Sequence, residues 1–447
     1  MTKEEEHALQ KLASSAASRF YKGELQEAAE ALQKIKEKKG EEPKLVHNVA
    51  LLDFVKSGFR RGDRFLQTLT KVKADLQERV RKASVDSVDG DSKEIEFAVE
   101  HDVAIAMYNE ALLFYQKRLY GKAIENLEPH FQSLEALEES VATKLSFLLY
   151  ECYMNTKDDQ KANEVIQKLA KTYALQLSER AEEGDQNGDG QEMEGGFPQA
   201  DWTAVKTMLM YAKARVHLWM SQLKSSKKDV KAVVALTSSN SSSVFLKAHL
   251  EYSKGNFRKA MKLLSSCQQP TSVESPLPSL FYNNMGCIHF RLKKHNAAAF
   301  YFSRALKHND ESLRAASSQM MDGSGKRKEK FSLGPKKSDA NGVNVLPRQN
   351  NKKCEMSYNI GLQLLLSGKP ELAFDCFREA SNLMYSDPRV WIRTAECCIA
   401  AQAMHVAERE ERLQPVAKTV KARGGQVLFL RPAVQEHFKP DRRYLGG

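Results

Sequence analysis

One acidic stretch contains residue types that bind calcium. The segment DQNGDGQEMEGG, residues 185 to 196, has oxygen-bearing side chains at its first, third and fifth positions and Gly190 at its sixth, as a helix-loop-helix calcium loop requires. Its twelfth position, where that loop needs a bidentate Glu, is Gly196. Pro198 also falls where the exiting helix should be running, and proline removes a backbone donor there. The spacing therefore favours a solvated acidic linker over a calcium site.

The other reactive side chains lack catalytic or metal-binding spacing. The seven Cys form no C-x-x-C pair and have no His nearby at zinc spacing. His289 and His295 are six residues apart and so do not share one face of a helix. The sequence also lacks a G-x-S-x-G, a P-loop and an H-E-x-x-H motif. We therefore predict reduced thiols, no metal, no cofactor and no enzymatic activity.

The composition of the 447-residue chain is typical of a helical protein. Pro and Gly number only 13 and 23, while Ala, Leu, Lys and Glu are common. The N-terminal MTKEEEHALQKLA lacks the apolar core of a signal peptide, and no uncharged apolar run reaches the length of a membrane span. We therefore expect a protein of the cytoplasm or nucleus.

The net charge of +11 is concentrated in one segment. Residues 322 to 353 hold nine Lys or Arg against three acids, and residues 178 to 194 are an acidic counterpart. Neither segment has the apolar content to offset the entropy lost on ordering, so we predict two disordered insertions. The basic cluster KRKEK, residues 326 to 330, could contact RNA phosphates or serve nuclear import, although solvation alone explains it.

The elements that must position any binding residue follow a 34-residue repeat, the period of the tetratricopeptide repeat. A first small residue recurs at that spacing, directly or once insertions are allowed, at Ala16, Ala50, Ala111, Ala214, Ala248, Gly286, Gly361 and Ala395. A second small residue follows twelve positions later, at Ala28, Ala123, Ala260, Ala298, Ala373 and Ala407. A large apolar residue comes four positions further on, at Leu32, Leu127, Leu264, Phe302 and Phe377. The pattern predicts two helices, A and B, in each repeat.

The residue types suit their places in these helix pairs. Small side chains let helices A and B approach closely, and the large apolar residue fills the space between repeats. A degraded copy at 140 to 175 has Tyr150 at the first small position, and Trp391 takes a large apolar position on the last helix A. We assign structural roles to Ala260, Gly286, Ala298, Gly361 and Ala373.

The predicted fold is all-α, an α-solenoid of tetratricopeptide-like helix pairs with disordered insertions and no single central core. The predicted organisation is N-terminal repeats over 1–177 with a loop at 84–95, an acidic linker over 178–201, central repeats over 202–309, a basic insertion over 310–353, C-terminal repeats over 354–407 and an irregular tail over 408–447.

The groove lined by the helices A is the predicted binding surface. Asn occurs two residues before the first small position at 48, 109, 284 and 359, where its amide can bond the backbone or terminus of a bound peptide. A polar groove residue without a ligand explains it equally well. The predicted partner-binding residues are His249, Asn283, Asn284, Arg291, Asn359 and Arg393.

Two other binding functions remain open. Asn359, Arg389 and Arg393 resemble part of the carboxylate clamp with which some repeat adaptors hold acidic C-terminal chaperone tails. Asn283 and Cys287 stand where that clamp needs Lys and Asn, so the clamp is incomplete. The second alternative is RNA binding through the basic insertion, although Phe331 is its one aromatic residue for stacking on bases.

Several segments resemble the subunit-ten family of the CCR-NOT mRNA deadenylase complex. They are VFLKAHLEYSKGNFRKAMKLL, FYNNMGCIHFRLKKHNAAAFYFSRAL, RVWIRTAECCIAA, FYKGELQEAAEALQKI and YNEALLFYQKRLYGKAIENL. The resemblance covers most of the chain and is weakest in the insertions.

The resemblance implies a non-catalytic helical scaffold. Its implied partners are subunit eleven and the N-terminal region of the large scaffold subunit. The implied roles are mRNA turnover, translational repression and RNA-mediated silencing in cytoplasm and nucleus, with poly(A)-tail shortening done by other subunits. Family members continue with further repeats, whereas this chain leaves the pattern after Ala407, so we expect a truncated or alternative terminus.

Overall fold

A computed structural model describes residues 3–59, 61–86, 91–134, 137–183, 199–237, 240–267, 277–319, 351–413, 417–422 and 425–430. Within these ranges the helices are α1 (Lys3–Lys22), α2 (Leu25–Lys39), α3 (Pro43–Lys56), α4 (Gly62–Asp86), α5 (Asp91–Gln116), α6 (Tyr120–Gln132), α7 (Glu139–Thr156), α8 (Asp159–Glu183), α9 (Gln199–Trp219), α10 (Leu223–Thr237), α11 (Ser241–Ser253), α12 (Phe257–Ser265), α13 (Leu277–Arg291), α14 (His295–Gln319), α15 (Lys353–Leu366), α16 (Pro370–Met384) and α17 (Pro388–Leu413). The strands β1 (Ala417–Ala422) and β2 (Gly425–Leu430) form an antiparallel hairpin.

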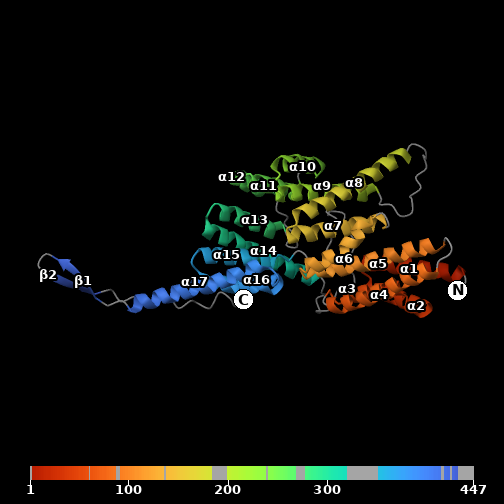
Figure 1. Cartoon of the computed structure of the whole chain (residues 1–447), viewed down its shortest axis with the longest axis horizontal. Helices are drawn as coiled ribbons and strands as arrows, with labels where there is room; N and C mark the ends of the chain where they lie inside the picture. The colour runs from red at the N-terminus through yellow and green to blue at the C-terminus, as the bar shows by residue number, and fades with distance from the viewer. Residues whose placement is uncertain are drawn as a thin grey trace.

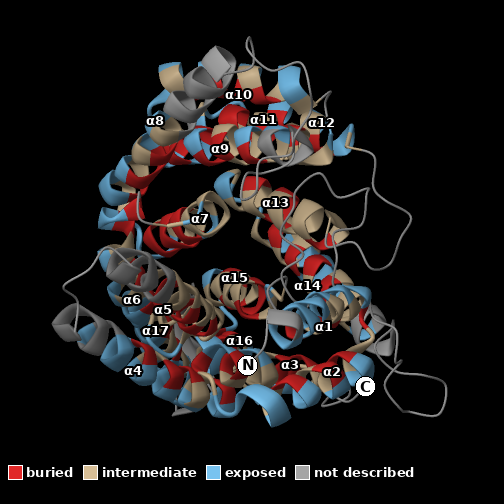
Figure 2. Ribbon diagram, turned by 90° about the vertical axis from the view of Figure 1, so that its right-hand side faces the viewer, coloured by how far each residue is buried: buried red, intermediate tan, exposed pale blue. Residues whose placement is uncertain are grey.

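The helices stack in chain order, as the repeat predicts. Each helix packs against the next from α1 to α17, and the pairs follow one another along a curved array (Figure 1). Seen from the side, the array coils into a ring, with α7, α9, α13 and α15 toward its inside (Figure 2). This arrangement confirms the predicted α-solenoid.

A left-handed backbone residue reverses the chain after most helices A. Such a residue, with φ between 58° and 82°, lies seven positions after the first small position of the repeat, at Gly23, Arg118, Lys157, Ser221, Gly255, Lys293 and Gly368. This conformation ends one helix and lets the chain turn back toward the next. The turn chemistry therefore repeats with the same period as the helix packing.

The core is a series of apolar clusters, as expected for a solenoid. The largest cluster joins α5, α6, α7, α8 and α9, and smaller ones link the helices on either side. Tyr150 lies inside the largest cluster with 1% of its surface exposed, and its hydroxyl donates to the Ala212 carbonyl at 3.3 Å. The bulk of Tyr150 is therefore accommodated at the first position of the repeat, where the other copies have a small residue.

The small positions assigned structural roles lie where helices A and B meet. Ala260, Ala298 and Ala373 are fully buried. A Cβ atom at Gly286 would lie 2.6 Å from the ring of Phe302, which is tighter than side-chain packing allows. At Gly361 the same atom would lie 3.1 Å from its nearest neighbours, in Cys376 and Phe377.

The helices run further than the sequence prediction placed them. Helix α4 runs to Asp86 and α5 begins at Asp91, so both ends of the predicted loop at 84–95 are helical. Helices α8 and α14 extend into the predicted insertions as far as Glu183 and Gln319. The calcium-like segment 185–196 and the basic residues 322–350 lie outside the described residues. The predicted irregular tail also contains the end of α17 and the hairpin.

The last repeat departs from the prediction. Ala407 was placed on a helix B, but α17 continues without a break from Pro388 to Leu413 and includes it. Gln402 stands seven residues after Ala395, where earlier repeats have a left-handed turn residue, and a run of good helix formers follows it. Trp391, which holds the large apolar position of this helix A, is 54% exposed.

Candidate functional site

The first small position of the repeat is followed directly by a charged or titratable side chain on three helices A. These residues are Glu151 of α7, Arg215 of α9 and His249 of α11. Nη1 of Arg215 lies 2.5 Å from Oε1 of Glu151. Desolvation lowers the pKa of the Arg215 guanidinium, but the attraction of Glu151 and Tyr150 and the hydrogen bond to Glu151 together raise that pKa above its usual value. The pair is therefore an ionic contact between separate helices A.

His249 lies near this ion pair and presents a titratable ring. The ring is exposed to solvent, yet the protein atoms around it lower its pKa by desolvation, and repulsion by Arg215 lowers it further. His249 is therefore mainly neutral near pH 7. In that state one ring nitrogen donates a hydrogen bond and the other accepts one, which suits contact with a peptide backbone.

Two of the predicted groove residues contact each other. The amide of Asn359 on α15 donates to Oδ1 of Asn283 on α13 at 3.1 Å, and both side chains are half-buried. Asn284 is half-buried beside Asn283, and Arg291 is exposed at the end of α13. With His249 on α11 and Arg393 on α17, the six residues are spread over four helices A.

Both arginines of the predicted carboxylate clamp already have acidic partners. Arg389 forms a two-point pair with Asp387, and Nη1 of Arg393 lies 2.5 Å from Glu396 one turn further along α17. These hydrogen bonds raise the pKa of both guanidinium groups. A peptide C-terminus would have to displace the acids, so the geometry does not favour a chaperone-tail adaptor.

One polar contact that the sequence did not indicate joins distant repeats. Arg118, in the α5–α6 turn, donates to Glu355 near the start of α15 at 2.7 Å, although the two are 237 residues apart. Desolvation lowers the pKa of the Arg118 guanidinium, but the attraction of Glu355, the hydrogen bond to it and the nearby Tyr120 and Cys354 together raise that pKa. The contact joins the α5–α6 turn to the start of α15. Neither residue belongs to a motif, so only the coiling of the solenoid reveals the pair.

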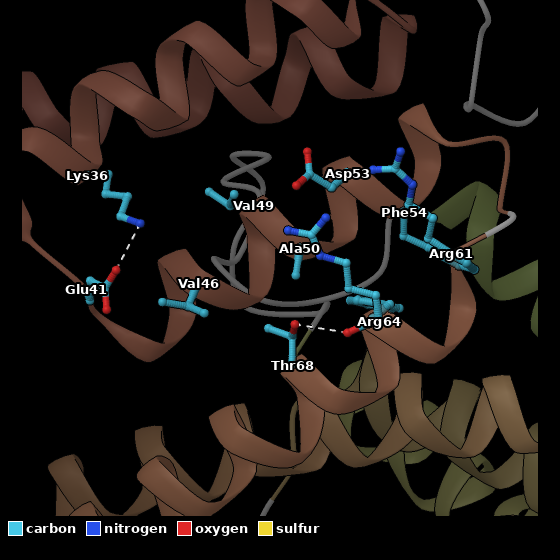
Figure 3. Close-up of a pocket in the computed structure, with 11 residues that line it drawn as sticks. Lys36, Glu41, Val46, Val49, Ala50, Asp53, Phe54, Arg61, Arg64 and Thr68 are labelled. Carbon is cyan, nitrogen blue, oxygen red and sulfur yellow. Dashed lines mark hydrogen bonds and ion pairs between the residues drawn. The ribbon is translucent and has the colours of Figure 1, made fainter.

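A hollow of about 200 Å³ lies between α2, α3 and α4. Figure 3 shows Lys36 paired with Glu41 at one end, at 3.1 Å, and side chains of both charges around the opening. The hydroxyl of Thr68 donates a hydrogen bond to the backbone carbonyl of Arg64 at 3.1 Å, so it is not paired with a side chain that could activate it as a nucleophile. Because the opening carries side chains of both charges, it does not favour a ligand of either charge. In the sequence, the basic stretch RRGDR at 60 to 64 is the feature that points to this hollow.

The described residues show no group of three or more His, Cys, Asp or Glu side chains placed to hold a metal ion. Desolvation raises the pKa of the Cys287 thiol on α13 to about 11, so this cysteine is protonated near neutral pH. Among the same residues, every helix is too short or too polar to cross a membrane.

The sequence is related to curated proteins along most of its length. It is 32% identical over 421 residues to the CCR4-NOT transcription complex subunit 10-B of Xenopus laevis, an alignment that covers 92% of this chain and 53% of the relative. It is 37% identical over 229 residues to the CCR4-NOT transcription complex subunit 10 of Danio rerio, an alignment that covers 50% of this chain and 35% of the relative. It is 26% identical over 441 residues to subunit 10 of Drosophila melanogaster, which covers 92% of this chain and 61% of the relative. The chain spans about half the length of the Xenopus relatives.

The solved structures that match this chain have low TM-scores and low sequence identity. A tetratricopeptide repeat protein from Parabacteroides merdae is 11% identical with a TM-score of 0.43, and the alignment covers 80% of this chain and 98% of that one. A Rap protein complexed with competence and sporulation factor is 10% identical with a TM-score of 0.42, covering 92% and 100%. The sequence matches no known protein-family model.

Proposed function

We propose that this relative of the subunit 10 proteins of the CCR4-NOT transcription complex is a non-catalytic scaffold subunit of that complex. In this role it supports poly(A)-tail shortening, mRNA turnover and translational repression through contacts with other proteins, in cytoplasm and nucleus. The proposed partners are subunit eleven and the N-terminal region of the large scaffold subunit.

The observation that carries the proposal is the alignment with subunit 10 proteins over 92% of the chain. The architecture supports it, because a solenoid presents a long continuous surface on which several partners can bind at once. On the helices A, His249 and the Asn283–Asn359 pair offer neutral donors and acceptors that suit a peptide backbone. The ion pair of Arg118 with Glu355 links the α5–α6 turn to the start of α15.

Co-expression tests the proposal directly. The chain is produced with subunit eleven and the N-terminal region of the large scaffold subunit, then purified at physiological salt with nuclease present. A stable stoichiometric complex is expected. Failure of a chain with a normal helical circular dichroism spectrum to form it would contradict the scaffold role.

A pair of matched variants locates the interface. The inner variant replaces His249, Asn283 and Asn359 with Ala. The outer variant replaces three exposed lysines of α10 with Ala, namely Lys227, Lys228 and Lys231. We expect the inner variant to lose partner binding and the outer variant to keep it. The reverse result would place the interface on the outer face.

A further inference from the structure

The repeats from α9 to α12 are strongly basic. Residues 203–267 contain twelve Lys or Arg and only two acids, Asp229 and Glu251. Both acids are 7% exposed and already have partners, Asp229 in His217 and Glu251 in nearby lysines. Neither carboxylate therefore offsets the positive charge at the surface. By contrast, residues 3–59 contain ten bases and ten acids.

Helix α10 carries part of this charge as a row on one face. Lys224, Lys227, Lys228 and Lys231 form this lysine row, and their spacing of three and four residues places them on the same side of the helix. All four are exposed, and none has an ion-pair partner among the described residues. In Figure 2 α10 lies at the upper edge of the molecule, above α9. The row is about 10 Å long, close to the screening length at about 0.1 M salt, so its charges act together on a ligand.

An exposed aromatic ring lies near the start of the lysine row. Trp219 is the last residue of α9, and three residues separate it from Leu223, the first residue of α10. The left-handed residue Ser221 turns the chain back within this connection, so Trp219 and Lys224 are closer than the roughly 18 Å that an extended chain would span. Trp219 is 47% exposed. An open indole surface therefore accompanies the four positive charges.

Proteins that bind single-stranded nucleic acid combine these two features. Their basic side chains contact the backbone phosphates, and their aromatic rings stack on the bases. Lys binds phosphate as a point charge, whereas a peptide carboxylate is matched best by the planar guanidinium of Arg, and α10 contains no Arg. A membrane-binding helix would insert its apolar face into lipid, but Val230 and Val233 of α10 are buried in the repeat. The chemistry of this surface therefore favours a nucleic acid over an acidic peptide or a membrane.

We propose that the lysine row of α10 and Trp219 form a binding site for single-stranded nucleic acid. The lysines contact successive phosphates, and the indole stacks on one base. Neither contact reads the edge of a base, so the site has little sequence preference. The site is separate from the predicted groove on the helices A and from the basic residues 322–353, and it does not depend on the proposed function.

Fluorescence anisotropy with a labelled oligo(U) of about 15 nucleotides tests the site on the full chain, at salt concentrations from about 50 to about 200 mM. In the test variant every lysine of the row becomes Gln, and in a second variant every one becomes Arg. The matched control makes the same change in net charge elsewhere, by replacing four lysines of the segment 322–353 with Gln, namely Lys326, Lys328, Lys330 and Lys336. An oligo(dT) of the same length should bind as well as the RNA, because neither type of contact uses the 2′-hydroxyl.

The salt dependence measures the phosphate contacts. Each contact with a single strand contributes about 0.7 to the slope of log affinity against log salt, so the Gln variant should lower that slope by about 3. In the wild type, the lysine row should account for about a fiftyfold loss of affinity between 50 and 200 mM salt. The control variant should change the slope by less than about 1, and the Arg variant should bind like the wild type.

The aromatic contact is tested by Trp219→Ala. We expect it to weaken binding at least about fivefold without changing the salt slope, because stacking on a base involves no counterion release. Trp391→Ala is the matched control, since Trp391 on α17 is exposed to a similar extent, at 54%, and should leave binding unchanged.

Three results would overturn the proposal. The first is a Gln variant of the lysine row with the affinity and salt slope of the wild type. The second is a larger loss in the control variant, which would place binding on residues 322–353. The third is displacement of the RNA by polyglutamate of equal charge, or by anionic lipid vesicles, as effectively as by unlabelled RNA, because the surface would then recognise negative charge without bases.

Discussion

A methyl group added at Gly286 should destabilise the contact between α13 and α14. The new Cβ would lie 2.6, 2.7 and 2.9 Å from three ring atoms of Phe302, and this ring is buried, so it has no open space to move into. Overpacking of this kind costs about 1–3 kcal/mol, and the better helix propensity of Ala over Gly returns up to about 1 kcal/mol. We therefore expect Gly286→Ala to lower the local free energy of unfolding by about 1–2 kcal/mol.

The second half of the experiment tests whether the clash is the cause. Phe302→Leu alone leaves a cavity beside Gly286 and should cost about 1 kcal/mol or more. Combined with Gly286→Ala, it recreates the Ala–Leu contact of Ala248 and Leu264, so the double variant should be more stable than the sum of the single changes predicts. We expect a favourable coupling of about 1–2 kcal/mol.

Hydrogen exchange of the α13 and α14 amides is the suitable assay, because a solenoid need not unfold in one step and a single melting temperature would average over repeats. Gly361→Ala, measured from the α15 and α16 amides, is the internal control. Its added Cβ would meet neighbours at 3.1 Å, so its loss should be smaller than that of Gly286→Ala. Strict additivity of the two changes in the double variant, or a larger loss at Gly361, would refute the argument that the clash is the cause.

Three further outcomes follow from other contacts. Arg118→Ala should remove about 1 kcal/mol from the ring-closing contact with Glu355, giving faster exchange at the start of α15 and a larger radius of gyration in X-ray scattering, while Arg118→Lys should give a smaller change. Hydrogen bonds, the strongest from Asn256, lower the pKa of Glu251 below its usual 4.5. The stability that the ionised Glu251 contributes is therefore complete above that pH and is lost as the pH falls through the lower pKa of the folded state. The difference in melting temperature between wild type and Glu251→Gln should shrink from about pH 6 to about pH 3. Tyr150→Ala should lower the free energy of unfolding of the largest cluster by about 3–5 kcal/mol, and Tyr150→Phe by only about 1 kcal/mol. Hydrogen exchange of the α7 amides measures both losses. Equal losses would show that the hydroxyl contact with Ala212 contributes more than packing does.

Much of the binding surface depended on contacts that the sequence pattern does not contain. The register correctly places Asn283 and Asn359 on helices A, but it leaves open whether their amides meet a ligand or each other, and in the structure they meet each other. Arg389 and Arg393 have the spacing of a clamp, yet acids nearby on the same chain already hold them. Their spacing alone therefore did not decide their availability to a ligand.

Most of the helix pairs, and the small and large residues at which they touch, follow from the sequence pattern alone. That information is local, because each repeat contacts mainly its neighbours, so small residues such as Gly286 and large ones such as Phe302 must recur at a set spacing. The tertiary structure decided how the repeats coil, which brings Arg118 to Glu355. It also decided that α17 continues through Ala407 and leaves Ala395 exposed. Small rotations between repeats add up along the solenoid, so contacts between distant repeats depend on all the packing angles between them.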